Sequence, residues 1–286
     1  MSTTIEDHKS SESQETAVFS DNQQDEETDQ HLIKSVPESS SAPHLAPKTT
    51  RNKRAICPRC ERPHPRACLC QALPHDRMSL QQCHVLVLQH PHEIRRKNRS
   101  LFLAEFCLTP DSITCVRTRK WQPASQPHHH GNSFHHDAAT KALMEPDKRD
   151  VWLIFPHPKA MSLRQALEER KARKSAESKT APILLPLTIV FLDATWKFAA
   201  EMQRGSVFPP HAQYVCLDAN DLQGIKPKRF DIRTPPSPEH LSTAECLALV
   251  VSRVEDNPEI YETIMKPLDL MVSQWHAFAD QKKEQK

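Results

Sequence analysis

Short apolar runs recur along the chain and predict a series of buried strands. Each run has four to six residues and ends close to a proline or a polar residue. That length and those boundaries are typical of strands in a covered sheet and too short for helices. The runs occupy residues 84–89, 151–155, 187–192 and 214–217.

Between and after these runs, apolar residues return at the spacing of helices. We expect helices at 95–107, 162–173, 197–203 and 246–254, and a last one from Asn257 that Pro267 should kink or restart. Residues 242–245 form a capping box, in which the Ser242 hydroxyl and the Glu245 carboxylate satisfy backbone amides at a helix start. Strands that alternate with helices predict an α/β fold with a mainly parallel sheet.

The pattern also divides the chain into parts. Residues 1–55 are rich in Ser, Glu, Asp and Gln and poor in large apolar side chains, so we expect a disordered tail. A small cysteine-rich knuckle at 56–75 and a main domain at 76–280 follow. Within that domain, residues 116–149 have few apolar positions and predict an irregular excursion, which includes a histidine-rich stretch at 128–136.

Composition excludes some functions and favours others. The chain has only three glycines, which excludes the glycine-rich loops that bind dinucleotides and nucleotide phosphates. The net charge of +2 averages an acidic tail with basic clusters at 51–54, 95–99 and 226–229. These clusters suit a polyanionic partner, although each could also be a solvated surface.

The chain shows neither a signal peptide nor an apolar run of about 18 residues, so we expect no membrane contact and a cytoplasmic or nuclear protein. In such reducing compartments cysteines are thiols or metal ligands. Four of the nine lie close together, namely Cys57, Cys60, Cys68 and Cys70. Their C-x-x-C and C-x-C spacing predicts a structural zinc site, with a redox dithiol as the alternative.

Polar side chains directly follow the apolar run at 187–192. Asp193, Thr195 and Trp196 would stand at the carboxyl end of a strand, where parallel sheets build their sites. Asp193 could accept a proton or merely cap the next helix. Trp196 could stack on a nucleobase or belong to the core.

Five short motifs follow one another along the chain. They are Cys57-x-x-Cys60 with Cys68-x-Cys70, Leu88-Gln89-His90-Pro91-x-Glu93, Ile154-Phe155-Pro156, Leu192-Asp193-Ala194-Thr195-Trp196 and Ser242-Thr243-Ala244-Glu245. In content and order they resemble the DTW-domain family from about Cys57 to Trp275. The basic stretch at 93–100 is more similar to the eukaryotic second paralogue than to bacterial members.

The resemblance implies a tRNA-uridine aminocarboxypropyltransferase that uses S-adenosylmethionine to form 3-(3-amino-3-carboxypropyl)uridine in tRNA. It also implies a fold related to the knotted SPOUT methyltransferases, with the knot, the oligomeric state and the identity of the tRNA left open. The catalytic candidates are then Asp193, Thr195 and Trp196. The candidates for binding S-adenosylmethionine are His90, Glu93, Pro156, Ser242, Thr243 and Glu245.

Several alternatives stay open. Glu93 could instead stabilise a helix amino terminus, and the box at 242–245 could be purely structural. The arginines Arg59, Arg62 and Arg66 around the knuckle are expected to contact tRNA phosphates. Two rival functions are an S-adenosylmethionine-dependent RNA methyltransferase and a non-catalytic zinc-containing RNA-binding module.

Overall fold

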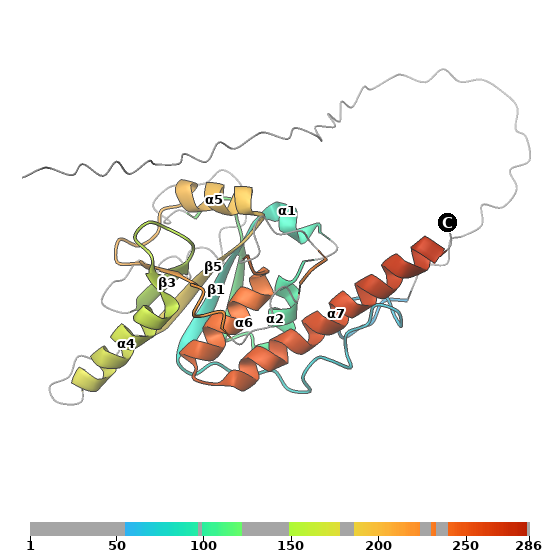
Figure 1. Ribbon diagram of the computed structural model, residues 1–286, viewed down its shortest axis with the longest axis horizontal. Coiled ribbons are helices and arrows are strands. Elements are labelled where there is room, and N and C mark those ends of the chain that lie inside the picture. Colours follow the sequence, from blue (N-terminus) through green and yellow to red (C-terminus); the bar gives the residue numbers. More distant parts are fainter. Residues whose placement is uncertain are drawn as a thin grey trace, which may run out of the picture. The chain divides into compact units, whose positions relative to one another are not determined.

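The predicted strands pair into one parallel sheet. The computed structural model describes residues 55–96, 99–121, 149–177, 186–223, 230–232 and 240–284, all of which belong to a single unit, Asn52–Lys286. These residues form six strands in the order β2-β1-β5-β3-β6-β4, and every pairing is parallel (Figure 1). The strands are β1 (Cys83–Gln89), β2 (Ile113–Arg117), β3 (Asp150–Ile154), β4 (Met161–Ser162), β5 (Leu187–Asp193) and β6 (Gln213–Cys216).

The sheet confirms all four predicted strands and adds two. Strand β2 lies partly within the stretch predicted to be irregular, and β4 was not predicted at all. Both are difficult to predict because β4 has two residues, while β2 buries only Ile113 and Val116 of its five. Strand β1 aligns with β5 over seven positions, ending with Gln89 opposite Asp193.

Helices cover both faces of the sheet. They are α1 (Pro91–Ile94), α2 (Leu101–Cys107), α4 (Leu163–Glu177), α5 (Trp196–Gly205), α6 (Thr243–Val254) and α7 (Pro258–Glu284). Val85 and Val87 of β1 share a core with α2, α6 and α7, whereas Leu86 and Leu88 pack with Met202 of α5 on the opposite face. This alternation follows from the two-residue repeat of a strand that is covered on both sides.

Two helix predictions were wrong in detail. Residues 95–107 do not form one helix, because α1 ends at Ile94 and α2 begins at Leu101. The apolar side chains that α2 buries start only at Leu101, whereas Arg95 and Arg96 are exposed. Helix α7 does not restart at Pro267 but runs through it. The Thr263 carbonyl, which a proline at 267 leaves without its helical donor, faces the Cys107 thiol at 3.4 Å.

The cysteine-rich knuckle packs against the second half of α7. The Gln274 side chain donates a hydrogen bond to the Cys68 carbonyl at 3.0 Å, and Arg62 lies 3.6 Å from the Met271 sulfur. The predicted tail, apart from residue 55, and the histidine-rich stretch both fall outside the described residues, as do the basic clusters at 51–54 and 226–229. Within the described part, no helix has the length and apolar character needed to cross a membrane.

Candidate functional site

The Asp193 carboxylate sits where the chain changes faces of the sheet. After the short α1, strand β1 leads into α2 on one face, while its neighbour β5 leads into α5 on the other. A parallel sheet is expected to bind ligands at the carboxyl ends of strands at such a switch point. The β1 and β5 ends are tied together there, because the His90 amide donates to the Asp193 carbonyl at 2.9 Å.

Two neutral donors hold the Asp193 carboxylate. Gln89 Nε2 donates to Oδ2 at 2.8 Å, and Thr243 Oγ1 donates to Oδ1 at 2.7 Å. Thr243 begins α6, so the carboxylate links β1, β5 and the amino terminus of α6. Asp193 is only 4% exposed and therefore faces these side chains and not open solvent. The contacts fix the direction of the carboxylate, as a catalytic or positioning group requires.

The amino terminus of α6 is built as the capping box predicts. Ser242 Oγ accepts the Glu245 amide at 3.3 Å, and the Glu245 carboxylate accepts the Ser242 amide at 2.8 Å. The other Glu245 oxygen accepts the Phe230 amide at 3.2 Å. Ser100 Oγ accepts the Ala244 amide at 3.3 Å. Glu245 and Ser242 therefore hold the helix start in place, and two of its first three amides are already bonded.

Thr195 and Trp196 begin helix α5 and have different surroundings. Thr195 is the N-cap, with its hydroxyl accepting the Phe198 amide at 3.5 Å, so the residue that caps this helix is Thr195 and not Asp193. Trp196 follows at the first helical position and is 40% exposed, which is not the burial of a core tryptophan. Its ring meets the His240 ring edge-on, with centroids 4.0 Å apart.

His90 and Glu93 lie at the end of β1, on the side of α5. The His90 ring stacks on Phe198 with centroids 4.4 Å apart, and its Nδ1 accepts the His92 amide as the N-cap of α1. Burial is the main cause that lowers the pKa of His90, followed by nearby His92 and Arg119, so the ring is neutral at pH 7. The buried Glu93 carboxylate lies 3.1 Å from Arg96 Nε.

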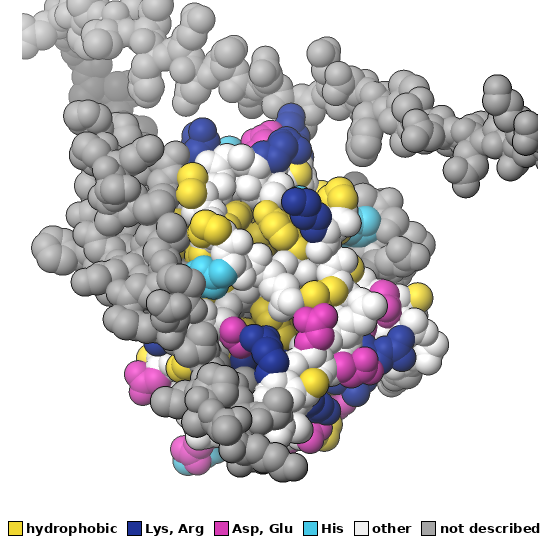
Figure 2. All heavy atoms as spheres, turned by 90° about the vertical axis from the view of Figure 1, so that its left-hand side faces the viewer, with side chains coloured by type: hydrophobic (Ala, Val, Ile, Leu, Met, Phe, Trp, Pro, Cys, Tyr) yellow, Lys and Arg dark blue, Asp and Glu magenta, His cyan; other side chains and the backbone are white. Residues whose placement is uncertain are grey.

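The candidate from the third motif stands further along the same edge of the sheet. Pro156 is exposed just after β3. The neighbouring His157 ring stacks on Tyr214 of β6, with centroids 4.0 Å apart, and Gln203 of α5 donates to the Tyr214 hydroxyl at 3.0 Å. On the face shown in Figure 2, most apolar side chains gather in the upper half below a few charged ones, whereas acidic and basic side chains lie together over the lower half.

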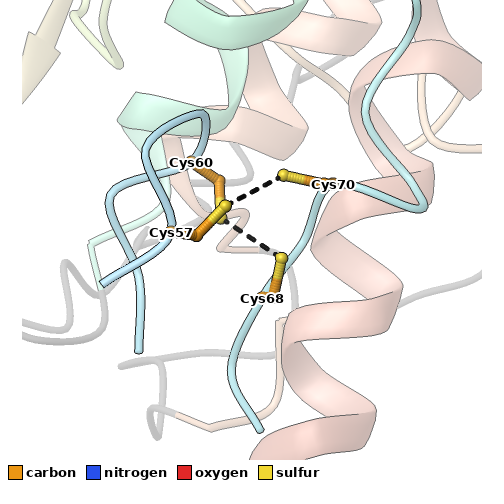
Figure 3. A group of neighbouring side chains, drawn as sticks. All are labelled: Cys57, Cys60, Cys68 and Cys70. Carbon is orange, nitrogen blue, oxygen red and sulfur yellow. Dashed lines mark hydrogen bonds between the residues drawn. The ribbon is translucent and has the colours of Figure 1, made fainter. Parts of the chain in front are cut away.

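The four predicted metal ligands come together from two loops (Figure 3). Their sulfur atoms all lie within 4.8 Å of one another. The Cys57 and Cys70 sulfurs are 3.4 Å apart, and those of Cys60 and Cys68 are 3.7 Å apart. Tetrahedral zinc with Zn–S bonds of 2.3 Å separates its sulfurs by about 3.8 Å, so the group fits that ion with little movement.

Backbone amides favour the thiolate at Cys57, whereas burial is the main cause that raises the pKa of Cys70 to about 12. The amides of Cys60 and Arg59 are the main causes that lower the pKa of the Cys57 thiol to about 6. The Leu69 amide donates to the Cys60 sulfur at 3.5 Å. Such N–H···S contacts are typical of the outer shell of a metal–thiolate site. The five remaining cysteines are free thiols elsewhere in the described fold.

The sequence missed residues that support the candidate site. Gln89 belongs to the second of the five motifs, but no local pattern indicates its role. The pairing of β1 with β5 places it opposite Asp193. Phe198 and His240 gave no signal, because each acts through a ring contact with a partner distant in sequence. The described residues bring Asp193 together with Thr243 at the amino terminus of α6, while Pro156 follows the end of β3.

Comparisons with known proteins agree with these motifs. A family model described as the DTW domain matches residues 54–276. "tRNA-uridine aminocarboxypropyltransferase 2" of Mus musculus is 27% identical over 221 residues, which is 77% of this chain and 63% of that protein. The Drosophila melanogaster protein of the same name is 26% identical over 217 residues, 76% of this chain and 73% of its own.

A plant relative and the structural comparison complete these findings. "tRNA-uridine aminocarboxypropyltransferase A" of Arabidopsis thaliana is 26% identical over 231 residues, covering 77% of this chain and 81% of that protein. The chain spans less than two thirds of the length of the mouse relative. No solved structure gives a significant match.

Proposed function

The chain belongs to the DTW domain family, and we propose that it transfers the 3-amino-3-carboxypropyl group of S-adenosylmethionine to N3 of a uridine in tRNA. The names of three relatives that align over three quarters of the chain support this reaction. The single observation that carries the proposal is the Asp193 carboxylate, which Gln89 and Thr243 orient at the switch point between β1 and β5.

The proposed reaction needs positioning more than strong chemistry. The bond between N3 and the propyl carbon forms as the carbon–sulfur bond breaks. Sulfur takes that electron pair and leaves as neutral methylthioadenosine, while N3 gives up its proton. The sulfonium activates three carbons, so the site selects the transferred group by holding N3 in line with one of them.

In this proposal Asp193 accepts the proton that N3 gives up. Gln89 and Thr243 each donate a hydrogen bond to its carboxylate, and each carboxylate oxygen can accept more than one partner. The other two candidates of the same motif contribute differently. Thr195 caps the start of α5, and the exposed Trp196 ring offers a surface on which a base can stack. Among the candidates for binding S-adenosylmethionine, the buried His90 and the exposed Pro156 follow the carboxyl ends of β1 and β3, the two strands that flank β5.

The cysteine cluster would hold a structural zinc ion, which supplies local fold stability and no reaction step. Arg66 is exposed beside it and is the arginine of the knuckle that would meet tRNA phosphates. Arg59 is also exposed, but its guanidinium donates to the carbonyls of Cys70 and Pro74. The Arg62 guanidinium packs over the Phe102 ring at 5.4 Å and donates to the Ala67 carbonyl. The kinship with the SPOUT fold is part of this proposal; its support is the all-parallel sheet.

Asp193→Asn tests the proposal. An amide can still accept a hydrogen bond from Gln89 or Thr243, but it is a poor proton acceptor. We expect methylthioadenosine formation from S-adenosylmethionine and unmodified tRNA to fall about 10²- to 10⁴-fold. Binding of tRNA should stay within about twofold of wild type, since phosphate contacts dominate affinity.

Controls separate the rival functions. Asp280→Asn, which changes an exposed carboxylate of α7, should leave the rate unchanged. Formation of S-adenosylhomocysteine by the wild type would indicate a methyltransferase instead. Tight tRNA binding with neither product would indicate a binding module. An Asp193→Asn variant that folds and reacts at the wild-type rate removes Asp193 from the mechanism.

A further inference from the structure

A cleft lies at the opposite end of the sheet from Asp193. It has a volume of about 450 Å³ and is bordered by the amino ends of β1 and β5, where Cys83 and Leu187 stand, and by α4. From Leu187 to Asp193 strand β5 makes six steps, which separate the two ends by about 20 Å. The cleft is therefore distinct from the candidate catalytic edge.

Three cationic side chains line this cleft, and they differ in how they are held. Arg170 is nearly buried and forms an ion pair with Asp150 at 2.5 Å, so its position is fixed. Arg149 donates to the Thr188 hydroxyl at 3.3 Å, which uses one of its five N–H donors. Lys174 is exposed and has no hydrogen bond or ion pair with any residue that the structure describes.

The acidic side chains near the cleft do not line it. Asp150 pairs with both Arg170 and Arg173. The Glu255 carboxylate is occupied by the backbone amides of residues 81–83, at 2.8–3.0 Å, and so shapes the rim. Asp111 is exposed, and its carbonyl bonds His84. Because the described lining includes Arg149, Arg170 and Lys174 and no acidic side chain, the positive charge is local to the cleft.

The remaining lining residues indicate what kind of ligand the cleft suits. The described lining includes no Phe, Tyr or Trp on which a nucleobase could stack. His84 is held at both ring nitrogens, by the Asp111 carbonyl and the Thr114 hydroxyl, and is not available to read a base. What the cleft offers is guanidinium and ammonium donors, which match the oxygens of phosphate.

We propose that this cleft binds phosphate groups of the RNA backbone, with Arg149 and Lys174 as the contacting residues. The inference rests on the proposed function for its ligand, because it treats tRNA as the substrate. A second phosphate contact about 20 Å from the reacting edge would fix the orientation of a large RNA without reading its sequence. Arg170, held by Asp150, keeps the cleft positive and shaped when no RNA is bound.

The test uses Arg149→Ala/Lys174→Ala with a charge-matched control. The control is Lys171→Ala/Lys266→Ala, which removes two exposed lysines that do not line the cleft. The dissociation constant for tRNA is measured from about 50 to 300 mM salt. We expect it to rise about three- to thirtyfold in the cleft variant, with a plot of log affinity against log salt less steep by about 1.4–1.8. The control should match wild type.

Each outcome has one meaning. Unchanged affinity and slope in the cleft variant overturn the proposal. The proposal is also overturned if inorganic phosphate raises the unfolding midpoint of the wild type only, while the wild type and the cleft variant bind tRNA equally. The ligand is then a small phosphate compound. At saturating tRNA the variant should form product at the wild-type rate. If the wild type forms no methylthioadenosine, the proposed reaction is refuted. If the cleft substitution in that case still weakens tRNA binding and lowers its salt dependence, the cleft proposal stands.

Discussion

Removal of metal from the cysteine cluster should destabilise the knuckle and release the second half of α7. The Cys60 side chain is 1% exposed and the adjacent Leu69 is fully buried, so the cluster is continuous with the main core. The Cys68 carbonyl holds Gln274 of α7. A zinc ion bound by the four thiolates would hold these loops closed, and chelation would remove that link between the two cysteine pairs.

The size of the effect follows from what the knuckle buries. Exposure of Leu69 costs about 1.5–3 kcal/mol, and loss of the Gln274 hydrogen bond costs about 0.5–1.5 kcal/mol. Together they amount to about 2–4.5 kcal/mol. For a domain of this size each kcal/mol shifts the midpoint of thermal unfolding by about 2–4 °C. We therefore expect a fall of about 4–18 °C on chelation.

The assay combines metal content, thermal unfolding and hydrogen exchange. Wild type should contain one zinc per chain, and Cys60→Ser should contain much less. Amide exchange should rise in residues 56–75 and around Gln274, but not in the buried strand β5. Cys216→Ser, which alters a free thiol outside the cluster, should behave as wild type. A metal-free protein with the same midpoint and exchange, or a reversible disulfide within the cluster, would refute a structural zinc site.

Two further substitutions test the edge around Asp193. Trp196→Ala should lower kcat/KM for tRNA by about five- to 150-fold, since stacking on a base is worth about 1–3 kcal/mol, and Trp196→Phe should retain most of the activity. Because the ring is 40% exposed, neither change should move the unfolding midpoint by more than a few degrees; a large drop would place Trp196 in the core instead. Thr243→Val removes the donor to Asp193 and should lower both the product rate and the unfolding midpoint, the latter by about 3–12 °C, whereas Thr243→Ser should restore both. Equal values for the valine and serine variants would show that this hydrogen bond has no role.

The strands and helices with strong apolar patterns could be predicted because an element buried on both sides has an apolar residue at almost every position. The run that became β5 is buried at almost every position, and the sequence located it to within one residue. Strand β2 was missed because it lies at an edge and buries only two side chains. Helix α7 passes through Pro267 because the freed Thr263 carbonyl faces Cys107 of α2, a contact that no local pattern reveals.

The candidate site shows the same division between local and distant information. Cysteine spacing predicted the cluster because four ligands within a short segment can only close on one centre. The hydrogen-bond partners of Asp193 were harder to predict, since Gln89 lies 104 residues away along the chain and Thr243 lies 50 residues away. Strand order decides that β1 is the neighbour of β5, and the sequence alone did not predict that order.

The position of β5 explains why three neighbouring motif residues have three different environments. Strand β1 pairs with β5 up to its last residue, whereas β3 stops opposite Phe191, so Asp193 is buried against Gln89 of β1. The chain must then turn to the opposite face to begin α5, which requires a cap, and Thr195 provides it. The next side chain emerges beyond that turn, so Trp196 is exposed. A carboxylate held from within and an aromatic ring presented outward, three residues apart, are what a site needs to bind a base and accept its proton.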